Sequence, residues 1–364
     1  VDCARGKFSK GSGSDTPFCH SAQRGYYTVD DNNNTVNSAA TGEIEASPGY
    51  YTVDVVGGAV RSGASNQLQV TAGHYACNYT ELDVYYPDYS SMASGAVNEC
   101  NCPQGKYSSS AGATICDTVN DGYEAVISFD TSDGGTTYTL ATSGATSQRP
   151  CPSGKYSNET VNHICTYAQA GKYTVDTNGN SVDEGAVSYA DCPKGKYSSG
   201  EGNTQCLIAP AGKFAANSSN KAVDSGATQA ISCPKGTYSA SIGEACFPCE
   251  EGKYQGSTGA TECFDILAGY QAIDGRTSGA DTMMPCPCGK YQPLEGKAAC
   301  ISAPNGTYAL DGAQAYVNIS SGSYPAKKKN DANCSGKEDE DCYEAVQVEA
   351  CEARLCPAGR YSYK

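Results

Sequence analysis

Cysteine is the residue type in this sequence whose number and spacing offer the most chemistry. The chain of 364 residues has 21 cysteines, and cysteines at this density serve as disulfides, zinc ligands or redox centres. Cys246-Phe-Pro-Cys249 has the spacing of a zinc or redox pair, but the sequence offers neither a second CxxC nor a thioredoxin-like setting. We therefore predict that one disulfide loop closes at Cys246 and that the next opens at Cys249.

No residue pattern in the sequence predicts catalysis. The three histidines, His20, His74 and His163, are isolated from one another and from any obvious nucleophile, and we expect each at the surface. The sequence contains no HExxH, no GxSxG elbow, no phosphate-binding GxxxxGK[ST] and no dinucleotide fingerprint. We predict a protein that is not an enzyme and that has no cofactor and no metal.

Calcium is the one metal for which partial motifs exist. The segments 30–34 and 176–180 place oxygen ligands at alternate positions, but neither has the glycine that a calcium loop needs at its sixth position. We predict Asx-rich turns there, and weak calcium binding stays open.

Glycosylation has stronger support, because the N-x-[ST] signal recurs along a chain that we predict to be secreted. We expect most of these asparagines to carry N-linked glycans: Asn33, Asn78, Asn158, Asn217, Asn305, Asn318 and Asn333.

Composition places the chain outside the cell. It has no Trp, 6 Phe and 3 Met against 27 Tyr and 41 Gly, too little apolar surface for an ordinary core. Small extracellular units replace such a core with disulfides, which a reducing cytosol would not allow. The net charge of −15 argues against nucleic acid and anionic membranes as partners, and no apolar stretch is long enough for membrane insertion.

A repeat organises the cysteines. The phrase Cys-Pro-x-Gly-Lys-Tyr-Ser is followed by a second Cys about fourteen residues after the first, and Cys3 begins a looser copy. This spacing predicts local disulfides, and Cys77 and Cys100 are left to pair with each other. The predicted pairs are Cys3–Cys19, Cys77–Cys100, Cys102–Cys116, Cys151–Cys165, Cys192–Cys206, Cys233–Cys246, Cys249–Cys263 and Cys286–Cys300.

A second, cysteine-free phrase alternates with the first. It reads Gly-Tyr-Tyr-Thr-Val-Asp at 25–30 and 49–54, with a close copy at 171–176. The glycines that open successive phrases between 154 and 236 are spaced by 17, 24, 17 and 24 residues. The period is therefore 41 residues, with two Gly-x-Tyr half-units in each.

Each half-unit has the composition of a β-hairpin. Gly supports the turn, Tyr and β-branched residues favour short strands, and a Ser, Gly, Ala and Thr cluster precedes the second Cys. A disulfide loop of this size contributes roughly 3 kcal/mol. Such a unit is too small to be stable alone, so its neighbours must stack. We predict an all-β, disulfide-rich, solenoid-like rod of short hairpin repeats.

The CPxGKYS…C pattern resembles the ephrin-receptor-type cysteine-rich repeat of extracellular proteins, which is related to growth-factor-receptor and TNF-receptor-like repeats. The resemblance covers most of residues 100–300 and the N-terminal part loosely. It implies secretion, β-hairpin ladders and contact with proteins. Units of that family usually carry Cys in both halves, whereas alternate halves here use Gly-Tyr-Tyr instead.

The pattern divides the chain into five parts. They are N-terminal, mostly Cys-poor repeats (1–73), a Tyr-rich insert (74–101), regular cysteine-rich repeats (102–308), a charged insert whose segment 341–355 could form a short helix (309–355), and an incomplete final repeat (356–364).

Five cysteines fall outside the regular scheme, and their odd number requires a free or intermolecular thiol. They are Cys288, Cys334, Cys342, Cys351 and Cys356. Cys356 opens a repeat whose second Cys is missing, so it is the candidate for an intermolecular link, for which the other four are candidate partners. Either the sequence is a window from a longer array, or another subunit completes the repeat head to tail.

Two functions fit these observations. The favoured one is an extracellular structural protein, the self-assembling protomer of a glycosylated fibril, appendage or surface layer, with itself as partner. The alternative is the binding or stalk ectodomain of a cell-surface receptor or adhesin.

Overall fold

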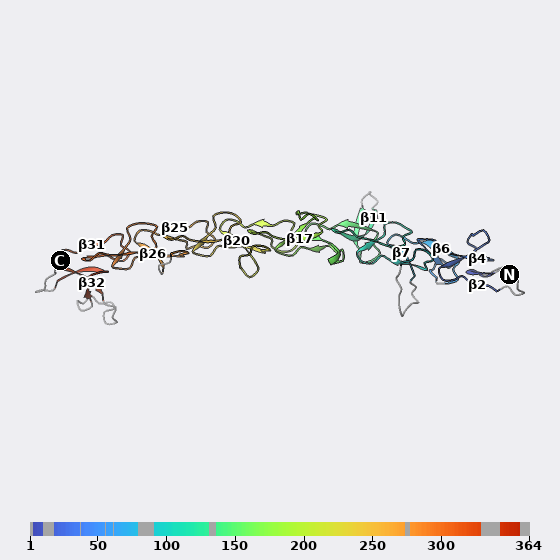
Figure 1. Ribbon diagram of the computed structural model, residues 1–364, viewed down its shortest axis with the longest axis horizontal. Helices are drawn as coiled ribbons and strands as arrows, with labels where there is room; N and C mark the ends of the chain where they lie inside the picture. The colour runs from blue at the N-terminus through green and yellow to red at the C-terminus, as the bar shows by residue number, and fades with distance from the viewer. Residues whose placement is uncertain are drawn as a thin grey trace. The chain divides into compact units, whose positions relative to one another are not determined.

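The protein is described by a computed structural model over residues 3–9, 18–36, 38–54, 56–60, 62–78, 91–130, 136–273, 277–328 and 343–356. Short antiparallel hairpins form nearly all of its regular structure, and the helical residues in these ranges are the 3-10 turn η1 (Glu159–Val161) and Ile273. The predicted all-β, disulfide-rich array of hairpin repeats is confirmed. The chain divides into two compact units, residues 1–169, 173–190 and 201–205 and residues 170–172, 191–200 and 206–364, and each is a succession of hairpins (Figure 1).

The strands as far as Tyr167 are β1 (Lys7–Phe8), β2 (His20–Ser21), β3 (Tyr26–Val29), β4 (Gly42–Glu45), β5 (Tyr50–Val53), β6 (Asn66–Gln69), β7 (His74–Cys77), β8 (Asn98–Asn101), β9 (Lys106–Tyr107), β10 (Asp117–Thr118), β11 (Tyr123–Asp130), β12 (Thr136–Leu140), β13 (Ser147–Pro150), β14 (Lys155–Tyr156) and β15 (Thr166–Tyr167). Those that follow are β16 (Lys172–Val175), β17 (Ser188–Asp191), β18 (Lys196–Tyr197), β19 (Leu207–Ile208), β20 (Lys213–Ala216), β21 (Gln229–Ser232), β22 (Thr237–Tyr238), β23 (Phe247–Pro248), β24 (Lys253–Tyr254), β25 (Phe264–Asp265), β26 (Tyr270–Ala272), β27 (Met283–Pro285), β28 (Lys290–Tyr291), β29 (Ile301–Ser302), β30 (Thr307–Tyr308), β31 (Val317–Asn318), β32 (Ser323–Lys328), β33 (Tyr343–Ala345) and β34 (Glu352–Leu355).

Between Cys102 and Cys246 two kinds of hairpin alternate, as the two sequence phrases predict. The disulfide-closed half-units have strands of two residues, as in β18–β19, where Tyr197 lies opposite Leu207. Most of the cysteine-free half-units have strands of four residues, as in β20–β21, where Phe214 lies opposite Ile231. The longer ladder supplies the main-chain hydrogen bonds that hold a hairpin without a covalent closure.

Backbone hydrogen bonds join each hairpin to the next one along the chain. The Ser157 amide, just after β14, donates to the carbonyl of Ala186 in the following hairpin at 3.0 Å. The same bond recurs from Ser108 to Ala145 and from Ser198 to Ala227. The accepting alanines are at most 1% exposed. Their small side chains therefore sit where two hairpins meet.

A second set of bonds reaches two hairpins along. The amide of Gly202 donates to the Ala168 carbonyl at 2.7 Å, and Gly202 in turn lies against Gly154, the glycine that opens the earlier hairpin. We call this contact the glycine ladder. Its steps pair Gly6 with Gly63, Gly25 with Gly95, Gly49 with Gly112, Gly73 with Gly144, Gly122 with Gly185, Gly154 with Gly202, Gly171 with Gly226, Gly195 with Gly243, Gly212 with Gly259, Gly236 with Gly279, Gly252 with Gly296 and Gly269 with Gly312.

Two steps of the glycine ladder lack a second glycine. Asn162 stands opposite Gly105 with φ 51°, and Glu349 stands opposite Gly289 with φ 59°. Both residues adopt the left-handed conformation that the other steps leave to glycine. Stacking therefore imposes this backbone shape even where the residue resists it.

The apolar core is a series of small separate clusters. One holds Val119, Ala125, Ala141 and Ala145, and another centres on Ile266. The first cysteine of most disulfide-closed hairpins is fully buried; these are Cys102, Cys151, Cys192, Cys233, Cys249 and Cys286. Such clusters bury little area each, so disulfides and main-chain bonds must hold the fold together.

The prediction of a short helix at 341–355 is wrong. The described part of that segment forms β33 and β34, which pair with the two ends of β32 in a three-stranded sheet. Ala and Glu favour a helix locally, but Cys351 is tied by a disulfide to Cys288 and Glu349 has a left-handed backbone. Tertiary pairing overrides the local propensity.

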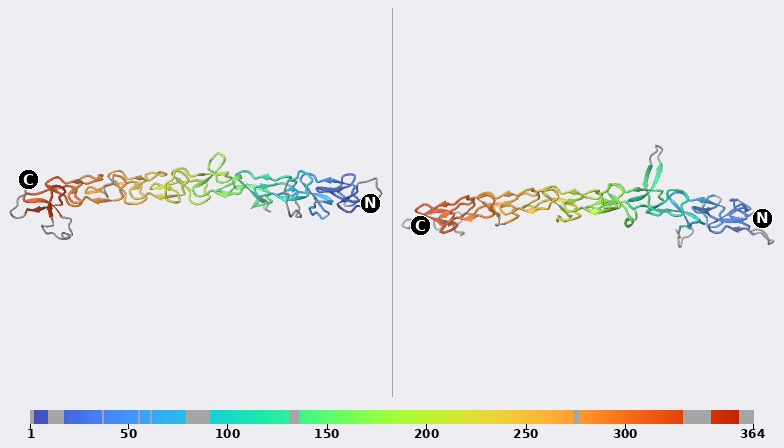
Figure 2. Two further views of the ribbon diagram at one scale, coloured as in Figure 1. Left: turned by 60° about the horizontal axis from the view of Figure 1, so that its bottom comes forward. Right: turned by 45° about the horizontal axis from the view of Figure 1, so that its top comes forward.

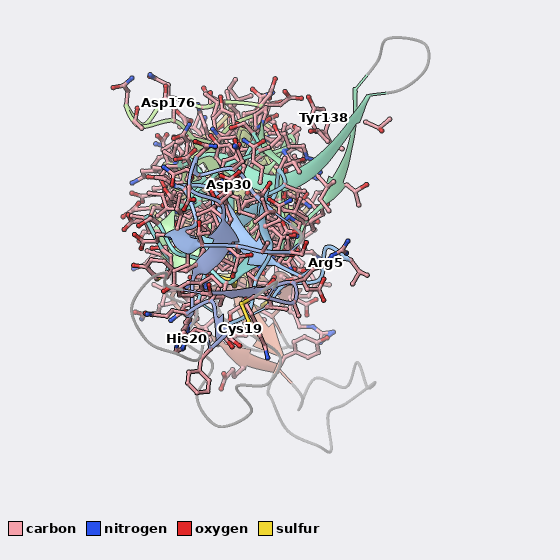
Figure 3. The ribbon with its side chains drawn as sticks, turned by 90° about the vertical axis from the view of Figure 1, so that its right-hand side faces the viewer. Arg5, Cys19, His20, Asp30, Tyr138 and Asp176 are labelled. Carbon is pink, nitrogen blue, oxygen red and sulfur yellow. A yellow bond between two sulfur atoms is a disulfide. The ribbon has the colours of Figure 1, made fainter. Side chains whose placement is uncertain are left out.

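One hairpin of the first unit is much longer than the others. β11 has eight residues and pairs with β13 near its start and with β12 over its second half. We call β12 with residues 126–130 of β11 the arm. It stands away from the neighbouring hairpins in Figure 2 and carries Tyr138 in Figure 3.

The expected Tyr-rich insert at 74–101 begins and ends as an ordinary hairpin. β7 pairs with β8, and Tyr75 lies opposite Cys100. The tyrosine cluster at 83–91 lies outside the described residues except for Ser91.

Candidate functional site

The structure brings together the cysteines of all eight predicted pairs. In each regular pair the first Cys precedes the opening glycine turn and the second directly precedes the return strand, as in Cys192–Cys206, with Cα atoms 5.7 Å apart. Cys246 and Cys249 belong to successive loops, bonded to Cys233 and Cys263. The remaining pairs are Cys3–Cys19, Cys77–Cys100, Cys102–Cys116, Cys151–Cys165 and Cys286–Cys300.

A ninth disulfide joins Cys288 to Cys351 across 63 residues. This pairing corrects the expectation that either cysteine is available to Cys356. The free thiol among the described cysteines is Cys356, which is half-buried. Cys334 and Cys342 lie outside the described residues.

The histidines are not brought together. His20 is exposed and His74 half-buried, with its Nδ1 3.0 Å from the Thr71 hydroxyl. The prediction of a surface position is wrong for His163, whose side chain is 10% exposed. His163 follows Asn162 at the ladder position where nine other half-units have Gly-Ala, and its ring packs beside Gly105.

The Asx-rich segments are turns whose carboxylates bind the chain itself. Asp176 Oδ1 accepts hydrogen bonds from the amides of Asn178 and Asn180, both at 2.8 Å. Asp30 and Asp54 form the same loop, and so does Asn217 with its amide oxygen. Across the described ranges, no three His, Cys, Asp or Glu side chains are grouped to hold a metal ion.

The loop at Asp176 predicts a specific response to acid. The pKa of Asp176 lies below its ordinary value, and the largest cause is the hydrogen bond that its carboxylate accepts from the backbone amide of Asn180. The loop bonds are therefore complete above that ordinary value and are lost as the pH falls through the lowered pKa. In NMR spectra of 15N-asparagine-labelled protein, we expect the amide signals of Asn178 and Asn180 to move together in this acidic range.

Two variants serve as controls for the assignment of this titration to Asp176. Asp176→Asn should keep the loop and abolish the titration, since Asn217 supports an equivalent loop without a carboxylate. Asp176→Ala should remove both amide bonds at every pH. A titration that persists in Asp176→Asn would contradict the assignment.

The predicted glycan acceptors differ in the exposure and in the hydrogen bonds of their asparagine side chains. Asn33, Asn305 and Asn318 are exposed. Asn78 accepts a hydrogen bond from Arg24, and the Asn217 amide oxygen anchors its turn. Asn158 donates through Nδ2 to the Val187 carbonyl at 2.9 Å and caps η1 through Oδ1. Asn333 lies outside the described residues.

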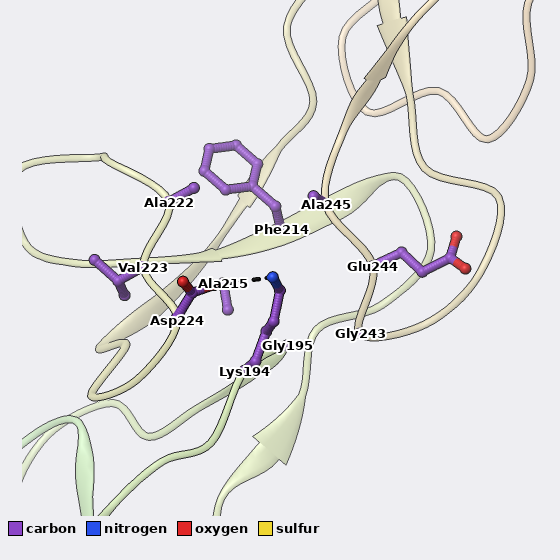
Figure 4. A pocket seen from close by; sticks show the side chains of 10 residues that line it. All are labelled: Lys194, Gly195, Phe214, Ala215, Ala222, Val223, Asp224, Gly243, Glu244 and Ala245. Carbon is purple, nitrogen blue, oxygen red and sulfur yellow. Dashed lines mark ion pairs between the residues drawn. The ribbon is translucent and has the colours of Figure 1, made fainter.

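A shallow pocket opens in the second unit where one half-unit is a residue shorter. The Cys233–Cys246 loop lacks one residue between Gly243 and Cys246 relative to its neighbours, and the Ala215 amide makes no backbone bond to the next hairpin there. Phe214 lines the opening (Figure 4).

The charged side chains at this pocket are exposed to solvent. Lys194 and Asp224 pair at 3.0 Å with side chains 74% and 85% exposed, so solvent screens the pair almost completely. Glu244 lies on the other side of the opening (Figure 4). The pocket is therefore best explained as a packing gap that the deletion leaves.

Sequence reasoning took the Gly-Ala pairs for hairpin-turn residues and missed their role in stacking. Their recurrence before nine of the return strands is the signal that could have revealed it: 63–64, 95–96, 112–113, 144–145, 185–186, 226–227, 259–260, 279–280 and 312–313.

None of the described residues forms a helix long and apolar enough to cross a membrane. The density of disulfides is that of an extracellular protein. In comparisons with known proteins, no family model and no curated protein matches the chain.

Proposed function

We propose that the protein is an extracellular structural element, one self-assembling protomer of a glycosylated fibril, appendage or surface layer, and not an enzyme. The proposal rests on the hydrogen bonds that the backbone amides and the Asx side chains make within the chain. Backbone amides join hairpins that are one or two places apart along the chain, through bonds such as Ser157 to Ala186 and Gly202 to Ala168. The Asx carboxylates close their own turns. Such a chain is built for mechanical continuity, because each repeat is fixed by its neighbours.

Electron microscopy of native material, isolated without reductant, tests this function. We expect ordered filaments or sheets, and antibodies to the chain should decorate them along their whole length. Single isolated molecules at every concentration would contradict the proposal. Head-to-tail assembly with Cys356 as a covalent link is part of the proposal. We therefore expect disulfide-linked oligomers of the wild-type protein on non-reducing gels, and their loss in Cys356→Ser.

A second candidate, a binding or stalk ectodomain of a receptor or adhesin, has one observation in its favour. The residue directly after the second Cys is apolar and about half exposed in several hairpins of the second unit: Leu207, Phe247, Phe264 and Ile301. Exposed apolar side chains are typical of surfaces that contact other proteins. The resemblance to ephrin-receptor-type repeats supports the same reading.

The exposure and hydrogen bonds of the asparagine side chains predict which N-glycosylation sites are occupied. We expect glycans on Asn33, Asn305 and Asn318, whose side chains are exposed, and none on Asn158, whose Nδ2 already donates to Val187. The measurement is glycopeptide mass spectrometry of the secreted protein. Full occupancy of Asn158 beside empty exposed sites would contradict this assignment.

A further inference from the structure

The arm has an edge that is not used in stacking. β12 pairs with β11 on one side, and none of the described strands pairs with its other side. Tyr138 is 46% exposed and Leu140 is 56% exposed. An open strand edge invites pairing with a strand of another chain.

The hydrogen-bonding pattern shows which groups this edge offers. The Ala141 amide donates to the Ala125 carbonyl, so the backbone of Ala125 faces β12. Alternation along an antiparallel pair then turns the backbone of Thr137 and Thr139 toward β11. The N–H and C=O groups of Thr136, Tyr138 and Leu140 therefore point away from the arm.

Nothing along this edge opposes pairing. β12 reads Thr-Thr-Tyr-Thr-Leu, with no charge and no proline, in a chain whose net charge is −15. The comparable edge strand at the C-terminal end, β33, carries Glu344 opposite Lys327. Charged residues on an edge are a common protection against pairing, and β12 lacks it.

The sequence of β12 also fits a second copy of itself. When two such strands run antiparallel with Tyr138 opposite Tyr138, Thr137 faces Thr139 and Thr136 faces Leu140. The outward groups of Tyr138 then form two N–H···O=C bonds across the two-fold axis. Paired aromatic residues and paired threonines are favourable across strands, and no like charges meet.

We propose that the arm is a homotypic docking strand, through which two copies of the chain join edge to edge at β12 about a two-fold axis centred on Tyr138. The second copy is the favoured occupant because a neutral, self-complementary edge allows two chains of the same net charge to approach. Such a contact closes on itself. It is separate from the head-to-tail contact in the proposed function and does not depend on it.

Cysteine cross-linking tests the register. In a Cys356→Ser background, Tyr138→Cys places two thiols on directly opposed residues, about 5.5 Å apart at Cα and within disulfide reach. Thr139→Cys is the matched control, because its copies are offset by two residues, roughly 7 Å along the strand. We expect disulfide-linked dimers to form about tenfold faster, or more, with Tyr138→Cys. Equal rates, or no dimer, would overturn the proposal.

Sedimentation velocity of the intact chain tests the contact without cross-linking. We expect a reversible dimer whose dissociation constant rises about tenfold or more in Tyr138→Pro, which removes an outward N–H that β11 does not use. Tyr138→Lys should weaken it similarly by opposing two like charges. A wild-type monomer at all concentrations, or a dimer unchanged in both variants, would refute it. Loss of the dimer with native filaments intact would leave the proposed function standing.

Discussion

Gly154→Ala should destabilise the protein by more than about 4 kcal/mol, the range reserved for severe steric or burial defects. A Cβ at position 154 would lie 2.1 Å from the Gly202 carbonyl oxygen. Gly202 cannot withdraw without losing its 2.7 Å bond to Ala168. The substitution therefore breaks a step of the glycine ladder, and the measurement is urea unfolding followed by circular dichroism.

Gly200→Ala is the matched control. Gly200 has φ 76°, the same as Gly154, but a Cβ there meets nothing within 4 Å. Its cost should be the conformational penalty alone, about 1–2 kcal/mol. Equal losses in the two variants would mean that backbone strain, and not close approach of hairpins, explains the regular spacing of these glycines along the chain.

Removal of the Cys192–Cys206 disulfide should cost about 3 kcal/mol, the value for a loop of this length. The hairpin that it closes has strands of only two residues, and the Cys192 carbonyl accepts the Gly226 amide at 2.8 Å. The double variant Cys192→Ala/Cys206→Ala should therefore lose this hairpin and its bond to the next. We expect rapid proteolysis within residues 193–205.

Two comparisons make the disulfide result specific. Cys356→Ser removes a thiol with no disulfide partner among the described cysteines and should leave stability unchanged. The β20–β21 hairpin, which has no disulfide, should resist the same protease in the wild-type protein. Resistance of 193–205 in the double variant would show that stacking alone holds the hairpin.

Much of the fold could be predicted because its determinants are local. The sequence separation of 14 between Cys192 and Cys206 fits one hairpin, so a fixed spacing indicates both the strands and the disulfide. Glycine at 154 marks a turn that other residues resist. The two recurring sequence phrases likewise predict the alternation of half-units with and without Cys.

The rest depends on contacts that no local pattern contains. Cys288 and Cys351 are 63 residues apart, and their pairing follows from stacking of the final hairpins. The segment 341–355 has helical composition, yet its pairing with β32 decides its structure. The sequence indicates a surface position for His163. Its burial follows from the glycine ladder, which brings His163 beside a hairpin two places earlier in the chain.

Disulfide mapping of the native, non-reduced protein tests the central claim most directly, that each cysteine-containing half-unit of the regular repeats is a hairpin closed by its own disulfide. Peptide mass spectrometry should find Cys102 linked to Cys116, Cys151 to Cys165 and Cys192 to Cys206, with Cys288 linked to Cys351. A bond that joins the regular cysteines of two half-units, such as Cys116 to Cys151, would contradict it.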